Sequence, residues 1–106
     1  MTKRIVITPK ASADLDKHFE YLAQYNIEVA LNFFDAARQT FAQIARTPGI
    51  GSPYIAKNQT LQGLRRWAVK GFNTQLIFYF ERDDFIEIIR VLNAARDIET
   101  IFTQKP

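Results

Sequence analysis

The sequence predicts an α+β domain with the element order β-α-α-β-β-β, in which an N-terminal strand and a helical hairpin pack on an antiparallel sheet. Three patterns indicate this class: a β-branched run at residues 3–8, two amphipathic helical repeats behind it, and three segments of alternating hydrophobicity in the second half. With 106 residues, of which 47% are hydrophobic, the chain is long enough for one core and too short for two ordinary domains. We therefore treat residues 1–106 as a single domain.

The two predicted helices are marked by the residues at their ends. Thr8 followed by Pro9 is typical of an N-cap and a first helical position, and an amphipathic repeat then continues to about Gln24. Asn26 is typical of a second N-cap, and a wider apolar stripe behind it continues until Pro48 stops the helix. Because the connection between the two helices is so short, we expect them to fold back as a hairpin.

The second half predicts a loop followed by a meander. Residues 47–61 have no regular pattern and predict a surface loop anchored by Tyr54 and Ile55. The predicted strands cover residues 62–69, 74–81 and 85–92, divided by hairpin-length turns at residues 70–73 and 82–84. Alternation in the last strand places four side chains on one face: Ile86, Ile88, Arg90 and Leu92. Asp97 is expected to cap a short terminal helix, and the tail beyond Thr103 is expected to fray.

The chain lacks the residues that several common catalytic, metal-binding and phosphate-binding sites require. The chain has no cysteine, which excludes disulfides, thiolate metal sites and a thiol nucleophile. A glycine-rich phosphate loop, a Ser-His-Asp set and a His-Glu-x-x-His helix are also missing. We expect neither a metal nor a cofactor, because Asp14 and Asp16 point apart on a helix, whereas Asp83 and Asp84 form a turn. No apolar stretch is long enough for a membrane span or a signal-peptide core, so a cytoplasmic protein is expected.

Positive charge is concentrated in the middle of the sequence. The net charge of +3 is modest, but no acidic residue occurs between Asp35 and Glu81. Six basic residues lie in this acid-free stretch: Arg38, Arg46, Lys57, Arg65, Arg66 and Lys70. Such a surface attracts an anionic partner, whether nucleic acid, an acidic peptide or an acidic protein face, over about 8 to 10 Å. The alternative is ordinary charge for solubility.

Short sequence words, in a consistent order, resemble the ParE/RelE toxin superfamily. The most specific is IIRVLNAARD at residues 88–97, which is similar to the closing strand and turn of ParE-type toxins, with Asn93 at a position that is frequently histidine. The supporting words are ADL at residues 13–15 with Tyr21, the segment 30–33, Pro48 with Gly51, LR at residues 64–65 and LIFY at residues 76–79. Together they span about residues 3–102.

The resemblance implies the toxin of a type II toxin–antitoxin system, a kind of system associated with plasmid stabilisation. ParE-type members inhibit DNA gyrase by binding, and a cognate antitoxin, here expected to be ParD-like with a ribbon-helix-helix domain, neutralises them in a hetero-oligomer; a homodimer is a further expectation. RelE-type members instead cut mRNA on the ribosome. The chain departs from the RelE pattern at Leu76, Ala94, Ala95 and Phe102, where basic and proton-transferring groups would be needed. We therefore predict a ParE-like toxin that is not an enzyme, with a ribosome-dependent endoribonuclease and a non-toxic complex partner as alternatives.

Two overlapping sets of candidate site residues follow. The candidates for binding the target or the antitoxin are Arg65, Arg66, Trp67, Arg90, Asn93, Arg96 and Asp97. The candidates for the nuclease alternative are Arg65, Arg66, Tyr79, Arg90 and Arg96. Because Arg65 and Arg66 are adjacent on a predicted strand, we expect them to point to opposite faces.

Most of these candidates also have a purely structural interpretation. Trp67 and Tyr79 could pack in the core, as large aromatic side chains in a sheet usually do. Arg90 could form an ion pair with Asp97 or Glu81, and Arg96 could form a local salt bridge with Asp97, which would also cap the terminal helix. The one histidine, His18, is predicted to be a solvated surface residue.

Overall fold

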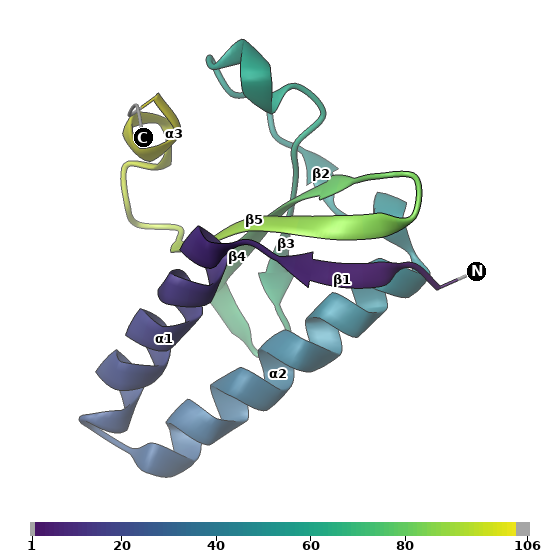
Figure 1. Ribbon diagram of the computed structural model, residues 1–106. Helices are drawn as coiled ribbons and strands as arrows, with labels where there is room; N and C mark the ends of the chain where they lie inside the picture. Colours follow the sequence, from purple (N-terminus) through teal and green to yellow (C-terminus); the bar gives the residue numbers. More distant parts are fainter. Residues whose placement is uncertain (1, 104–106) are drawn as a thin grey trace.

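The computed structural model describes residues 2–103 and confirms an α+β domain in the predicted element order, with one additional short strand, β2. Figure 1 shows the helical hairpin on one side of the sheet and the short C-terminal helix on the other. The strands are β1 (Arg4–Ile7), β2 (Ser52–Pro53), β3 (Arg65–Val69), β4 (Phe72–Glu81) and β5 (Phe85–Asn93). The helices are α1 (Pro9–Ala23), α2 (Ile27–Arg46) and α3 (Ile98–Thr103), with single 3-10 turns at Pro48–Ile50 and Gln59–Leu61. The tail beyond Thr103, which was predicted to fray, lies outside the described residues.

Both helices of the hairpin begin where their end signals predict. The Thr8 Oγ1 atom accepts a hydrogen bond from the Ala11 N–H group at 3.2 Å. The Asn26 Oδ1 atom accepts bonds from the N–H groups of Glu28 and Val29 at 2.9 and 3.3 Å. These side chains satisfy N–H groups that have no partner within their own helix. The starts of both helices are therefore determined by local sequence.

The strands form one sheet in the order β1-β5-β4-β3-β2. β1 pairs with β5 in parallel and the other neighbours are antiparallel, so the predicted meander is confirmed. Its first turn is shorter than predicted: only Lys70 and Gly71 join β3 to β4, because Gly71 adopts a φ of 81° that permits a tight turn. β3 begins at Arg65 rather than at residue 62, since Gly63, with a φ of 92°, lies in the preceding turn.

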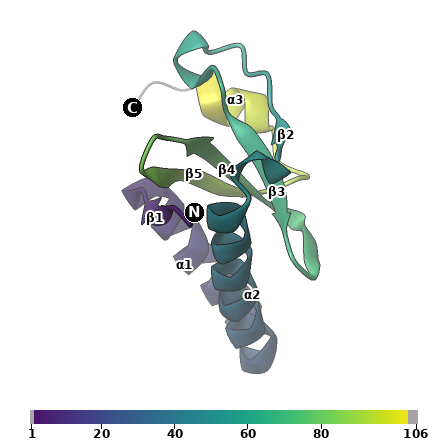
Figure 2. The same cartoon turned by 90° about the vertical axis from the view of Figure 1, so that its right-hand side faces the viewer.

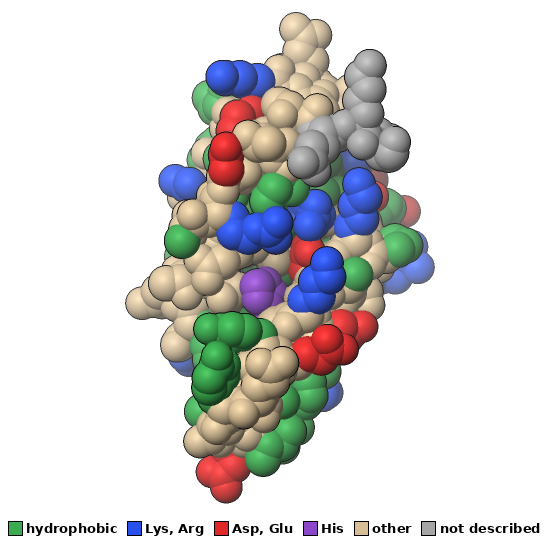
Figure 3. All heavy atoms as spheres, turned by 90° about the vertical axis from the view of Figure 1, so that its left-hand side faces the viewer, with side chains coloured by type: hydrophobic (Ala, Val, Ile, Leu, Met, Phe, Trp, Pro, Cys, Tyr) green, Lys and Arg blue, Asp and Glu red, His purple; other side chains and the backbone are tan. Residues whose placement is uncertain are grey.

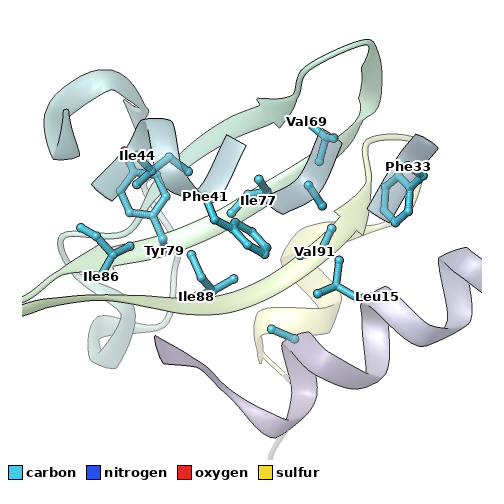
Figure 4. Close-up of a cluster of buried hydrophobic side chains, with 12 residues drawn as sticks. Leu15, Phe33, Phe41, Ile44, Val69, Ile77, Tyr79, Ile86, Ile88 and Val91 are labelled. Carbon is cyan, nitrogen blue, oxygen red and sulfur yellow. The ribbon is translucent and has the colours of Figure 1, made fainter. Parts of the chain in front are cut away.

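The sheet carries a hydrophobic core on each face. One core lies between the sheet and the helical hairpin, and Figure 4 shows side chains from both layers converging in it. The other lies under α3 and the loop before β3, which Figures 1 and 2 show on the opposite side of the sheet from the helical hairpin. At its centre the Phe78 ring meets those of Tyr54 and Phe102, with centroid distances of 5.3 and 5.1 Å. Each fully buried side chain of this size stabilises the fold by about 1.5–3 kcal/mol.

β5 contains an irregularity that the alternating pattern did not predict. Its pairing with β4 shifts between Arg90, opposite Phe78, and Ile88, opposite Tyr79. Ile89 is therefore an extra residue, a β-bulge that changes the face to which later side chains point. The expectation that Ile86, Ile88, Arg90 and Leu92 share a face was wrong for this reason. Ile86 and Ile88 belong to the core under the hairpin, whereas Leu92 belongs to the core under α3.

Tyr79 anchors the loop between α2 and β3 from beneath. Its side chain is fully buried, and its Oη atom donates to the Pro48 carbonyl oxygen at 2.7 Å and accepts from the Gly51 N–H group at 2.9 Å. These contacts place the loop beside β3, where it forms the two-residue strand β2 that the sequence did not predict. Tyr54 packs into the second core as predicted, but Ile55 is 90% exposed, so its predicted role as an anchor was wrong. The neighbouring Tyr54 ring already occupies the space against that core.

Gly51 is the position at which this anchor is most sensitive to added volume. A Cβ atom there would lie 2.6 Å from the Tyr79 Oη atom and 2.8 Å from the Arg66 carbonyl oxygen. We expect Gly51→Ala to lower the free energy of unfolding by about 1–3 kcal/mol, the usual cost of overpacking, in urea denaturation. Gly49→Ala is the matched control, because a Cβ atom at Gly49 meets nothing within 4 Å. Equal stability of the two variants would contradict the anchor.

Candidate functional site

The junction between α1 and β5 contains a nearly buried ion pair. The Asp14 carboxylate, in a residue only 6% exposed, accepts bonds from the Arg90 Nε and Nη2 atoms at 2.7 and 2.9 Å. The same carboxylate accepts the Val91 N–H group at 3.0 Å. The hydrogen bond to Asp14 raises the pKa of Arg90, so the guanidinium stays charged. The expectation that Arg90 pairs with Asp97 or Glu81 was wrong, because Arg90 lies at the bulge, where its side chain reaches α1 instead.

His18 lies one turn further along α1 and completes this junction. Its Nε2 atom lies 3.0 Å from the Val91 carbonyl oxygen, and its ring meets Phe33 edge-on with 5.8 Å between centroids. The prediction that His18 is a solvated surface residue was wrong, because the side of α1 that carries it faces β5. Figure 3 shows Lys and Arg side chains gathered near the single histidine on this face of the molecule. α1 therefore satisfies both backbone polar groups of Val91.

Two of the nuclease candidates are tied into the loop before β3. Burial raises the pKa of the Tyr79 phenol, whose oxygen already bonds to Pro48 and Gly51. The Arg65 Nη1 atom donates to the Gly51 carbonyl oxygen at 2.6 Å. A phenol that is buried, already hydrogen bonded and raised in pKa is poorly suited to proton transfer with a substrate.

Arg66 and Trp67 occupy opposite faces of β3. Arg65 and Arg66 also point to opposite faces, as predicted. Arg66 is exposed, and its guanidinium lies 5.8 Å from the centre of the Tyr54 ring. Trp67 is half-buried against the core of the hairpin, with its Nε1 atom 3.4 Å from the Gln43 Oε1 atom. Arg66 is therefore the more accessible of the two to an external partner.

The remaining candidates form the turn between β5 and α3. The Asn93 Oδ1 atom accepts the Ala95 N–H group at 2.8 Å. The Asp97 carboxylate caps α3 as predicted, accepting the N–H and hydroxyl groups of Thr100 at 3.2 and 2.6 Å, and these bonds lower the pKa of Asp97. The alternative of an Arg96–Asp97 salt bridge is not realised within residues 2–103. Arg96 is exposed at this turn.

The basic residues of the acid-free stretch lie mainly on the surface. All except the half-buried Arg65 are exposed, and none of the six takes part in a salt bridge within the described part of the chain. They extend from α2 across the loop to the turn after β3. Their charge is thus available to an anionic partner.

Over the same described residues, no three acidic or histidine side chains are grouped to hold a metal ion, and no helix is long and apolar enough to cross a membrane.

The sequence patterns did not reveal that Asp14, His18 and Gly51 contribute to these contacts. Asp14 and Arg90 are 76 positions apart, so no local spacing links them. One signal was available, because Asp14 and His18 are four residues apart and therefore share a helix face. That face lies next to the apolar residue Leu15, which predicts contact with the sheet rather than with solvent.

Comparison with known proteins agrees with this architecture. The model of a family described as the ParE toxin of the type II toxin–antitoxin system, parDE, matches residues 5–98. The chain belongs to the ParE toxin family. The family predicted from residues 88–97 and the supporting words is therefore confirmed over most of the sequence.

Two solved structures share the fold of this ParE toxin. A chain of the chromosomal ParDE toxin–antitoxin system from P. aeruginosa is 18% identical, with a TM-score of 0.68 over 87% of this chain and 96% of that one. A chain of the toxin–antitoxin complex RelBE2 from Mycobacterium tuberculosis is 21% identical, with a TM-score of 0.58 over 88% and 99%. At these identities the likeness concerns the fold and does not extend to the target. No curated protein sequence matches the chain significantly.

The Asp14–Arg90 pair is expected to hold α1 of the ParE toxin against its sheet. Asp14→Ala leaves the Arg90 guanidinium without its counter-charge and the Val91 N–H group without its acceptor. We expect the free energy of unfolding, measured in urea, to fall by about 3 kcal/mol, the lower end of the range for a broken buried pair. Asp16→Ala, at an exposed position of the same helix, should change it by less than about 0.5 kcal/mol. A similar, small change in both variants would refute the structural role of the pair.

Proposed function

We propose that this ParE toxin inhibits DNA gyrase by binding it and thereby blocks replication in the cytoplasm. The observation that carries the proposal is the family assignment together with exposed basic side chains that form no salt bridge within residues 2–103. Arg66 on β3 and Arg96 before α3 are the exposed cations among the candidate binding residues. A basic surface complements the negative potential of an enzyme that holds DNA, and it accelerates the encounter.

The contacts of the candidate nuclease residues support binding rather than hydrolysis. Cleavage of an RNA phosphodiester requires a base, an acid and cations that converge on one phosphate. Tyr79 is fully buried, Arg65 is bonded to Gly51, and Arg90 is bonded to Asp14. The chain also departs from the RelE pattern at four positions, where it has residues without proton-transferring groups: Leu76, Ala94, Ala95 and Phe102. A RelE-type endoribonuclease would therefore have few side chains left in this chain with which to build a catalytic centre.

We further propose that a ParD-like antitoxin with a ribbon-helix-helix domain neutralises the toxin in a hetero-oligomer. Its acidic and apolar C-terminal segment would fold across the helical hairpin and the basic edge of the sheet. Large apolar side chains exposed on the hairpin support this: Tyr21, Tyr25, Ile27 and Leu31 are 51–75% exposed. Figure 3 shows apolar side chains at the free end of the hairpin. Covering them by coupled folding of a disordered segment buries on the order of 1,000–3,000 Å².

Purified gyrase and relaxed plasmid DNA test the proposed target. We expect the toxin to inhibit ATP-dependent supercoiling, and the double variant Arg66→Glu, Arg96→Glu to require about tenfold more protein for equal inhibition, because rim charges steer association. The matched control is Lys10→Glu with Lys17→Glu, an equal charge change at exposed positions of α1, which should act like the unaltered toxin. Undiminished supercoiling at excess toxin would sink the proposal.

A further inference from the structure

The outer strands β1 and β2 are both shorter than the strands with which they pair, β5 and β3. At one edge β1, and beyond it the α1 side chains Asp14 and His18, bond to the backbone of β5. At the other edge β2 pairs with β3 only at Arg65 and Arg66. On this side, away from β4, the rest of β3 up to Val69 has no strand next to it within residues 2–103. An uncovered strand edge is a template for pairing with another chain.

The backbone polar groups of Ala68 point out of this uncovered edge. The Tyr54 N–H group donates to the Leu64 carbonyl oxygen at 2.8 Å, so the backbone groups of Leu64 face β2. Because the backbone groups of alternate strand residues point the same way, those of Ala68 point outward too. Two residues further along, in the turn after β3, the Lys70 N–H group donates to the Thr40 Oγ1 atom at 3.1 Å. Ala68 thus lies between satisfied neighbours, with no partner on this side within the described residues.

A groove of about 700 Å³ runs along the same edge, between α2 and β3. Its walls include Thr40 and Arg46 from α2, and Trp67, Ala68 and Lys70 from β3 and the turn after it. Arg46 and Lys70 are exposed, form no salt bridge within residues 2–103, and share the groove with no acidic residue. Figure 2 shows the β3–β4 hairpin projecting past α2 with no strand on its outer side.

We propose that the groove at Arg46, Ala68 and Lys70 binds an extended acidic polypeptide segment that adds to β3 as a further strand. Ala68 supplies one donor and one acceptor, which is the pair that the backbone of another strand complements. A nucleic-acid phosphate could use the N–H group but would leave the carbonyl oxygen unsatisfied, which favours a polypeptide. Arg46 and Lys70 pair with its carboxylates. The segment belongs to the antitoxin, an identification that rests on the proposed function.

Hydrogen exchange of the Ala68 amide measures strand addition directly. In the isolated toxin this edge amide should exchange quickly, because its N–H group faces the groove. In the complex with the full-length product of the adjacent antitoxin gene, we expect its exchange to slow by about tenfold or more. The amide of Asp84, in the exposed turn between β4 and β5, is the control and should exchange at the same rate in both samples.

Charge-neutralising variants test the contribution of the groove to affinity. We expect Arg46→Gln with Lys70→Gln to weaken antitoxin binding about tenfold, because two charge pairs at exposed positions each contribute modestly to affinity. Arg38→Gln with Lys57→Gln removes the same charge from the acid-free stretch at exposed positions that do not line the groove. This control should change the affinity by less than about twofold, and thermal unfolding of each variant verifies that it is folded.

The outcomes separate this inference from the proposed function. If the unaltered toxin does not bind the antitoxin, strand addition and the proposed neutralisation both fail, whereas gyrase inhibition is tested separately by the supercoiling assay. If the complex forms, but Ala68 exchange is unchanged and the two double variants bind alike, strand addition is overturned while neutralisation by an antitoxin stands. If neutralising Arg46 and Lys70 instead abolishes binding of a labelled single-stranded oligonucleotide and spares the antitoxin, the groove serves nucleic acid and the polypeptide is overturned.

Discussion

The Asp14 carboxylate is the constraint on which the arrangement of the two layers depends. It bonds to the Arg90 side chain and to the Val91 N–H group where β1 has ended and the edge of β5 would otherwise be uncovered. A buried carboxylate is costly unless it is paired and fully hydrogen bonded, so few orientations of α1 satisfy it. His18 fixes the same orientation through the Val91 carbonyl oxygen. With α1 held there, the apolar stripe of α2 is directed onto the sheet.

The features that the sequence predicted correctly depend on residues close together in the chain. The features that it missed depend on residues far apart in the chain. Helix starts at Thr8 and Asn26 depend on hydrogen bonds to residues within three positions, and they were predicted correctly. The bulge at Ile89 was not predicted. The alternating pattern of β5 also fits an unbroken strand, and only the pairing with β4 reveals the extra residue. Among the candidate site residues, the cap at Asp97 is local and was predicted, whereas the partner of Arg90 lies 76 positions away.

The contacts of each side chain separate structural residues from those available for function. Side chains with the chemistry of a nuclease, such as Tyr79 and Arg90, are used to hold the loop and the hairpin in place. Exposed cations that form no salt bridge in residues 2–103 include four on α2, on β3 and in the turn after it: Arg38, Arg46, Arg66 and Lys70. Because one fold can serve more than one mechanism, the contacts that each side chain makes matter more than the fold. In this chain those contacts favour binding of a partner over catalysis.

The claim that this ParE toxin binds its target rather than cutting RNA is tested most directly by primer extension on translated mRNAs after the toxin is induced without its antitoxin. We predict intact transcripts accompanied by an SOS response, since arrested gyrase interrupts replication while leaving mRNA chemistry untouched. Codon-linked cuts in these transcripts, without an SOS response, would contradict the claim and assign the exposed arginines to a catalytic centre.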